Sequence, residues 1–232
     1  MRIDDLPEIV RERLRLSWWL REANIPNHLR SMNWRRFEGE GNEEAARVAW
    51  DLADLWAHEN EPRGLALFGK PGVGKSSVLS TALTTFIDQT MPTTIPEVFN
   101  EKVKAYFMTL SEYHQLYLDY FELDRWSKPS EVTAELGSDW EKNYRKRKFI
   151  EQEVQVLVID DVGKEHTTDS QFIEDRFYSL IRGRWSLGLS TSITSNLGLK
   201  AYETAYGEAQ ASFLHEACFV KEIKGRDLRR VG

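Results

Sequence analysis

The segment from Gly69 to Ser76 constrains the fold of this chain more than any other part of the sequence. It reads Gly-Lys-Pro-Gly-Val-Gly-Lys-Ser, which is the spacing G-x-x-x-x-G-K-S. Apolar residues 65–68 precede it, and residues 77–83, which are typical of a helix, follow it. A strand, a glycine-rich loop and a helix in this order predict a phosphate-binding loop, because glycines allow successive backbone N–H groups to point at phosphate oxygens.

Each position of this loop has an expected role in binding ATP. Lys75 is expected to reach the β- and γ-phosphates, and Ser76 to offer its hydroxyl to Mg²⁺. The nucleotide-binding residues predicted from the motif are Gly69, Lys70, Pro71, Gly72, Val73, Gly74, Lys75, Ser76 and Ser77. The loop therefore predicts ATP and Mg²⁺ as the ligands of the protein.

Composition excludes several other classes of protein. The chain has 232 residues, of which 41% are hydrophobic and 29% charged, as in one large globular domain or a domain with a small appendage. The net charge of −6 excludes a strongly basic nucleic-acid coat protein. A single cysteine, Cys218, forms neither an internal disulfide nor a multi-cysteine zinc site, and no apolar run approaches membrane-spanning length. We expect a cytoplasmic protein with no membrane partner.

Apolar segments alternate with helical patterns along the chain. Strands are expected at residues 65–68, 103–109, 154–159, 189–194 and 218–223. Helices are expected at residues 1–24, after Asn42, and at 77–83, 110–121, 170–184 and 203–216, with a helical insertion at 122–148. This alternation predicts an α/β fold in three layers, with a central parallel sheet flanked by helices. We divide the chain into a short N-terminal helical arm, residues 1–26, and a nucleotide-binding domain, residues 27–232.

Polar side chains follow two of the predicted strands. Asp160 and Asp161 end the strand 154–159, and Asn196 follows the strand 189–194. Asp160 is expected to hold Mg²⁺ together with Ser76, because a neighbouring parallel strand brings a carboxylate to the metal in P-loop proteins. Asp161 either polarises the attacking water or caps the next turn, and Asn196 either orients the water or forms a turn.

Taken together, these segments resemble the AAA+ ATPases of the DnaC/DnaI/IstB group. The resemblance covers roughly residues 25–230 and rests on Gly69–Ser76, Val156–Gly163, Thr194–Leu197 and Gly225 with Arg229. It implies an AAA+ (ASCE) P-loop fold with little or no lid domain. It also implies catalytic roles for Lys75 of Walker A, Asp160 and Asp161 of Walker B, Asn196 as sensor 1, and Arg229 placed like sensor 2.

The sequence departs from the family at one position of catalytic importance. The family's helix before the last strand usually reads Ser-Arg-Leu, and its arginine acts in the site of a neighbouring subunit. Here residues 211–214 read Ala-Ser-Phe-Leu, so that Phe213 takes the place of the arginine. A trans arginine accelerates hydrolysis by several orders of magnitude where it is used. We therefore expect weak hydrolysis, a substitute such as Arg182 or Arg184, or a protein whose main role is ATP-dependent binding.

The resemblance implies three alternative functions. The first is a helicase loader in the initiation of DNA replication, which self-associates with ATP, binds single-stranded DNA and delivers the replicative DNA helicase. The second is a transposition helper of the IstB kind, which assembles on duplex DNA and recruits a transposase. The third is a nucleotide-dependent adaptor without catalysis, an interpretation that Phe213 favours.

Two segments are candidates for contacts with partners. The helix at residues 1–24 either packs on the main domain or docks a partner protein. The basic run Arg145–Lys148, flanked by Tyr144 and Phe149, either contacts DNA or forms the solvated face of a helix.

Overall fold

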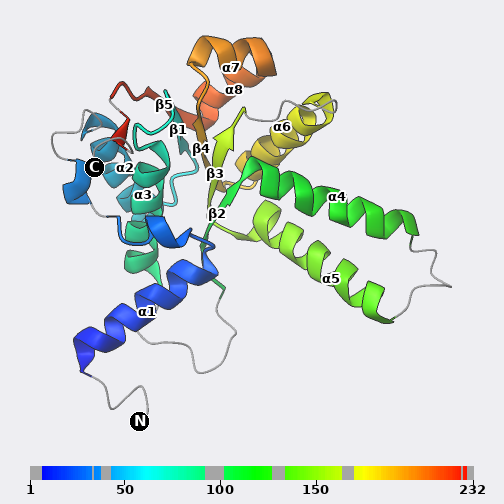
Figure 1. Cartoon of the computed structure of the whole chain (residues 1–232), viewed down its shortest axis with the longest axis horizontal. Helices are drawn as coiled ribbons and strands as arrows, with labels where there is room; N and C mark the ends of the chain where they lie inside the picture. Colours follow the sequence, from blue (N-terminus) through cyan, green and yellow to red (C-terminus); the bar gives the residue numbers. More distant parts are fainter. Residues whose placement is uncertain are drawn as a thin grey trace.

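The computed structural model describes residues 7–32, 34–37, 43–91, 102–126, 134–163, 170–225 and 227–228. A sheet of parallel strands lies at the centre, with helices on both of its faces (Figure 1). The strands are β1 (Gly64–Phe68), β2 (Ala105–Thr109), β3 (Val156–Val162), β4 (Ser190–Ser195) and β5 (Cys218–Glu222). They lie in the order β2-β3-β4-β1-β5, and every neighbouring pair is parallel. The predicted three-layer α/β fold is confirmed.

Successive side chains of the central strands enter two separate hydrophobic cores. Leu65 and Leu67 of β1 belong to one core, and Ala66 and Phe68 belong to the other. All of these side chains are fully buried, which explains why β1 is apolar without interruption: a parallel strand covered on both faces has no solvent-facing side.

The helices divide between the two faces of the sheet. The first core contains α1 (Glu8–Glu22), α2 (Glu43–His58) and α3 (Lys75–Thr90). The second core contains α4 (Leu110–Trp126), α6 (Ser170–Ser186), α7 (Leu199–Tyr206) and α8 (Glu208–Ala217). Two short 3₁₀ segments, η2 (Asn27–Leu29) and η3 (Trp34–Phe37), lie between α1 and α2.

Strand β4 is central and yet consists mainly of serine and threonine. Its hydroxyl groups are buried because they have hydrogen-bond partners. The Ser192 hydroxyl accepts a bond from the Leu65 amide at 2.9 Å, and the Ser195 hydroxyl donates to the Val162 carbonyl at 2.7 Å. These bonds join β4 to both of its neighbours, which makes polar side chains acceptable at the centre of the sheet.

The N-terminal arm is continuous with the first core. Trp19, at the end of α1, is fully buried, and the chain that follows α1 meets the edge strand β2. The Phe107 amide donates to the Ala23 carbonyl at 2.8 Å, and the Asn24 side chain donates to the Phe107 carbonyl at 2.9 Å. The boundary that we placed at residue 26 therefore does not coincide with a break in packing.

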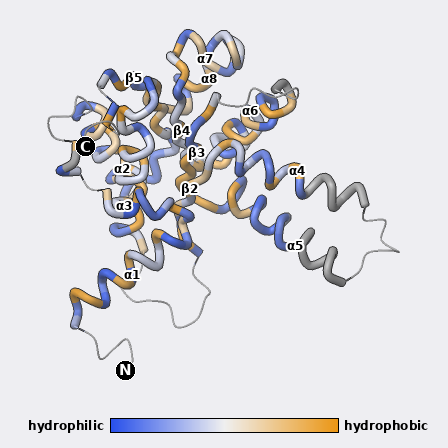
Figure 2. The backbone as a smooth tube through the Cα atoms, in the orientation of Figure 1, coloured by the Kyte–Doolittle hydropathy of each residue, from blue (hydrophilic) through white to orange (hydrophobic). Residues whose placement is uncertain are grey.

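The first part of α1 extends away from the body of the molecule (Figure 1). Residues 8–14, about two helical turns, are all exposed. Hydrophobic positions occur along this projecting part (Figure 2), and Ile9 and Leu14 are 60% and 44% exposed.

The helix predicted at residues 110–121 and the helical part of the predicted insertion form a pair of helices, α4 and α5, that project side by side from the sheet (Figure 1). Helix α4 continues to Trp126, beyond the predicted end at residue 121, and α5 spans Ala134–Lys148. A π-helical turn, η4 (Phe149–Glu153), which the sequence did not predict, connects α5 to β3.

The single helix predicted at residues 203–216 is wrong. The chain forms α7 and α8 instead, and Gly207 separates them with a φ of +86°. This positive φ interrupts the helix and is accessible to glycine at little cost. None of the helices in the described residues is both long and apolar enough to cross a membrane.

Candidate nucleotide-binding site

The predicted phosphate-binding loop connects the end of β1 to the start of α3. Gly72 and Gly74 have φ values of +83° and +94°, which a residue with a Cβ rarely adopts. Gly74 is the N-cap of α3 and offers no side-chain acceptor to the first N–H groups of the helix. A helix N-terminus of this kind binds anions, because its N–H groups and its dipole both favour negative charge.

Lys75 is buried at the centre of the loop, with 5% of its surface exposed. Its ammonium group donates to the carbonyls of Gly69 at 2.8 Å and Lys70 at 2.9 Å. It also donates to the side-chain oxygen of Asn196 at 2.9 Å. The ammonium therefore lies between the loop and the end of β4, which is where the motif requires a positive charge.

Asp160 forms an oxygen cluster with two hydroxyl groups. Its Oδ1 accepts hydrogen bonds from Ser76 Oγ at 2.7 Å and from Thr194 Oγ1. Magnesium usually takes one or two protein oxygens and completes its shell with phosphate oxygens and water, so Ser76 and Asp160 fit this ion. In the described residues no group of three or more acidic, histidine or cysteine side chains forms a fuller metal site.

Asp161 lies beside Asn196 at the end of the sheet. Asn196 Nδ2 donates to Asp161 Oδ1 at 3.0 Å, and the Asp161 amide donates to Thr194 Oγ1 at the same distance. The register between β3 and β4 shifts after Ile159, and Asp161 has a φ of +61°. This irregularity sets the direction of the Asp161 side chain. Asn196 thus links Lys75 to Asp161 through the two ends of its amide.

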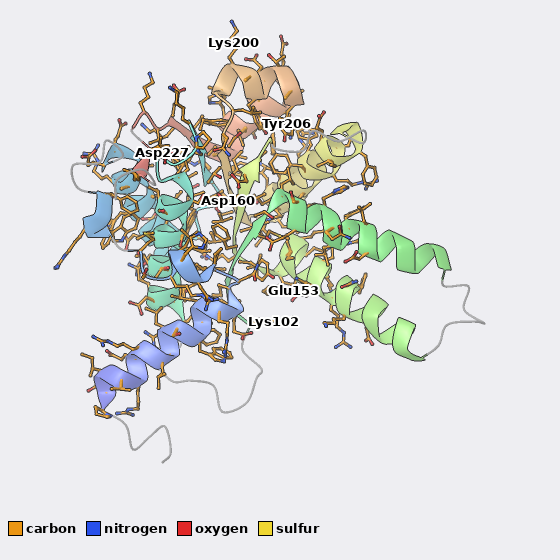
Figure 3. The ribbon with its side chains drawn as sticks, viewed as in Figure 1. Lys102, Glu153, Asp160, Lys200, Tyr206 and Asp227 are labelled. Atoms are coloured by element: carbon orange, nitrogen blue, oxygen red, sulfur yellow. The ribbon has the colours of Figure 1, made fainter. Side chains whose placement is uncertain are left out.

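These side chains line one pocket of about 730 Å³. The loop residues Gly72, Gly74, Lys75, Ser76 and Ser77 contribute one part of the wall, together with Asp160, Asp161, Asn196 and Thr109. Figure 3 shows Asp160 near the centre of the molecule, while Lys102 and Glu153 lie at the opposite end of the sheet. The site is therefore at the carboxyl end of the strands, as is usual for α/β sheets.

The rest of the wall is mainly apolar and was not predicted from the sequence. It consists of Pro26, His28, Leu29, Met32, Phe37, Phe107 and Leu228. Most of these residues belong to η2, η3 and the chain around them, far from the loop in sequence. The only sequence signal was the helix break at Ile25-Pro26, which marks where the chain turns but not what it faces.

The two proposed substitutes for a trans arginine have different environments. Arg184 is fully buried and donates to the carbonyls of Val154 at 2.9 Å and Ser190 at 2.8 Å. Burial lowers its pKa to about 9. Arg184 therefore stabilises the junction of η4, β3 and β4, and the expectation that it acts in a neighbouring site is wrong.

Arg182 is exposed, and its guanidinium lies over two aromatic rings. The ring centres of Tyr178 and Phe213 are 5.0 and 4.8 Å from it. Phe213 itself is 7% exposed and lies edge-on to Tyr178. Arg229, the residue expected to act as sensor 2, lies outside the described residues.

Searches against protein-family models and curated proteins find no match. Comparison with solved structures finds DnaI, with a TM-score of 0.59 and 19% identity over 88% of this chain and 94% of that one. The DnaC helicase loader matches with a TM-score of 0.58 and 18% identity, over 86% of this chain and 100% of that one. DnaA bound to AMPPCP and single-stranded DNA matches with a TM-score of 0.58 and 13% identity, over 84% of this chain and 50% of that one.

The fold and the loop together define a three-layer α/β protein with a P-loop between β1 and α3. Within that class, the structure shares its fold with DnaI and DnaC over nearly their whole length. The resemblance inferred from the sequence motifs is thereby confirmed at the level of the fold.

Proposed function

We propose that this protein is an AAA+ ATPase that loads the replicative DNA helicase during the initiation of replication. The observation that carries the proposal is the meeting of Lys75, Ser76, Asp160, Asp161 and Asn196 in one pocket. Three separate segments of the chain supply these groups, and each group has the chemistry that triphosphate hydrolysis needs. The fold shared with helicase loaders supports the biological role.

The pocket residues divide the work of hydrolysis. Lys75 and the loop N–H groups bind the phosphates of ATP, and the apolar wall from Pro26 to Phe37 accommodates the base. Mg²⁺, when bound at Ser76 and Asp160, neutralises phosphate charge. Asp161 accepts a proton from the attacking water, and Asn196 holds the Asp161 carboxylate in place through its amide.

A cation from a neighbouring subunit completes this site in an ATP-dependent oligomer. We assign this role to Arg182, because Phe213 and Tyr178 support its guanidinium at the surface. Aromatic support restricts the side chain and leaves its N–H groups available to an anion. The arginine is thus carried by α6, next to the family's usual position on α8.

Single-stranded DNA is proposed to bind along the C-terminal part of α5, residues 142–148, which we call the base of α5. Lys142, Lys146 and Lys148 are exposed there, and Tyr144 is 39% exposed. Arg147 contributes less, because it lies over the Tyr117 ring and pairs with Glu151 at 3.5 Å.

Phe149 differs from the expectation for a base-stacking residue. It is partly buried, and its ring packs against Tyr106 with centres 6.0 Å apart. It therefore belongs to the core beneath the helix pair, and of the two aromatic residues that flank the basic run we propose Tyr144 for stacking on a base.

The projecting part of α1 is proposed to dock the helicase. Its exposed Ile9, Val10 and Leu14 form an apolar stripe with no covering element among the described residues. A short amphipathic helix of this kind fits a hydrophobic groove on a partner.

The decisive experiment measures the native mass of the protein mixed with the replicative helicase from its own genome, with and without ATP. A discrete complex larger than the helicase hexamer supports the loader. The Lys75→Ala variant is the control, because it removes the phosphate-binding charge and should lose the ATP-dependent part of assembly. No complex with the helicase, together with ATP-driven assembly on duplex DNA, would instead indicate a transposition helper.

A further inference from the structure

The chain that follows β5 crosses the phosphate-binding loop. We call residues 223–225 and 227–228 the C-terminal strap. At its start, the Ile223 amide donates to the Phe68 carbonyl at 2.7 Å, and at its end the Leu228 amide donates to the Gly72 carbonyl at 2.9 Å. The strap is therefore fixed to both ends of the segment Phe68–Gly72.

Two glycines of the loop lie in direct contact with this strap. A Cβ added to Gly69 would lie 2.4 Å from the Ile223 carbonyl oxygen. A Cβ added to Gly72 would lie 1.9 Å from Oδ1 of Asp227. Because these two positions have no side chain, the loop can adopt its positive φ values and the strap can lie directly against it. The strap thereby brings the carboxylate of Asp227 against the backbone of the loop.

The position of Asp227 has an electrostatic consequence. The loop and the N-terminus of α3 favour an anion, and the chain places one of its own there. A bound nucleotide would bring several negative charges to the same loop, and like charges at short range repel each other strongly away from bulk water. Leu228, the next residue, lines the nucleotide pocket, so the strap and the nucleotide share one wall.

We propose that Asp227 is a built-in anion that competes with nucleotide phosphates for the loop. Binding of nucleotide then pushes the strap away from Gly72, and the position of the strap follows the nucleotide state of the protein. This inference rests on the proposed function, because it requires that the pocket binds ATP. It adds a regulatory residue that the Walker and sensor motifs do not include.

The test compares the nucleotide affinity of the full-length protein with that of Asp227→Asn. The substitution keeps the size and shape of the side chain, removes its charge and exchanges one acceptor oxygen for an NH2 donor. We expect ATP and ADP to bind about 5-fold more tightly at low salt, and we expect this gain to shrink at high salt because mobile ions screen the repulsion. The control is Glu153→Gln, which makes the same change in charge at the opposite end of β3, where Glu153 pairs with Lys102.

A second measurement follows the strap itself. Hydrogen exchange of the peptide that contains Leu228 should accelerate when nucleotide is added, because the bond from its amide to the Gly72 carbonyl is weakened. Equal or weaker nucleotide binding by Asp227→Asn would overturn the competition and leave the strap with a structural role only. If the natural protein and both variants bind no nucleotide, the proposed function falls as well, so the two failures are distinguishable.

Discussion

At the scale of single residues, Asp161 is the group whose chemistry matters most. Its carboxylate accepts a hydrogen bond from Asn196, and its backbone bonds to Thr194. These contacts fix its direction at the end of β3. A carboxylate held this way can take a proton from water, whereas Asp160 is occupied by two hydroxyl groups.

The Asp161→Asn variant separates binding from hydrolysis. We expect it to bind ATP with unchanged affinity and to hydrolyse it about 100-fold more slowly, because the amide cannot accept the proton. Steady-state phosphate release and nucleotide binding would be measured on the same preparation. Loss of ATP binding would show instead that Asp161 is structural.

The Arg182→Ala variant tests the cation supplied by a neighbouring subunit. Hydrolysis by the assembled protein should fall by roughly two orders of magnitude, while ATP binding by the monomer should not change. Arg47→Ala, which removes an exposed arginine from α2, is the matched control. Equal hydrolysis by the two variants would remove Arg182 from the site.

Because Phe213 is buried, an arginine placed at this position would disturb the core and would not test catalysis in a neighbouring site. Phe213 is 7% exposed between Tyr178 and Trp185, so an arginine at this position would place a charge in the core. For this reason the cation supplied by a neighbouring subunit is better tested by replacing Arg182 than by the substitution Phe213→Arg.

At the scale of elements, α1 has two halves with different environments. The second half is packed on α3, where Arg15 pairs with Asp88 at 2.7 Å, and the first half is exposed. Truncating the first half should therefore leave the core intact. The projecting turns can be altered without loss of the fold, so a loss of helicase binding in such a variant would report directly on docking.

The double variant Ile9→Ser with Leu14→Ser should abolish the complex with the helicase and leave thermal stability and ATPase activity unchanged. Both side chains are exposed, so their loss costs the folded chain little. The control is Leu187→Ser, which removes another hydrophobic side chain that is 56% exposed. A complex that survives the double variant would place the docking surface elsewhere.

The proposed DNA-binding surface at the C-terminal part of α5 is tested by removing its positive charges. Replacing Lys142, Lys146 and Lys148 with alanine should weaken binding to single-stranded DNA and reduce the slope of log affinity against log salt by about 2, because each phosphate contact contributes about 0.7. The control replaces Lys200 on α7, Lys221 on β5 and Lys224 in the C-terminal strap, all of them away from α5. An equal effect of the two triple variants would show only a general effect of net charge.

At the scale of the whole molecule, the nucleotide pocket joins segments from the two ends of the chain. Its wall is formed by the loop, the ends of β3 and β4, Leu228, and the N-terminal residues Pro26, His28, Leu29, Met32 and Phe37. A ligand in such a pocket stabilises every segment that it contacts. Folding and nucleotide binding are therefore expected to be strongly coupled in this protein.

Saturation with ATP should raise the melting temperature. At 100 times the Kd, mass action contributes about 2.7 kcal/mol, which corresponds to a rise of roughly 5–10 °C for a domain of this size. The shift should disappear in Lys75→Ala, and scanning fluorimetry or calorimetry measures it. A shift of equal size in that variant would mean that ATP binds at another site.

The sequence by itself determined the parts whose physical requirements are local. The loop Gly69–Ser76 needs glycines at positive φ, the buried strand β1 needs a continuous apolar run, and Asp160 and Asp161 come directly after the apolar run of β3. Neighbouring residues are enough to express each of these requirements, so the strands and the phosphate-binding end of the site were predictable.

The tertiary structure decided the features that depend on which distant segments meet. Arg184 is a buried structural residue because two separate segments, η4 with its C-cap and the start of β4, direct their carbonyls toward it. Arg182 is supported by a phenylalanine on another helix. The apolar wall of the pocket and the contact of Asp227 with Gly72 likewise join segments that are far apart in the sequence. Such contacts leave no periodic or local pattern, because the partner of each residue is set by the packing of the whole fold.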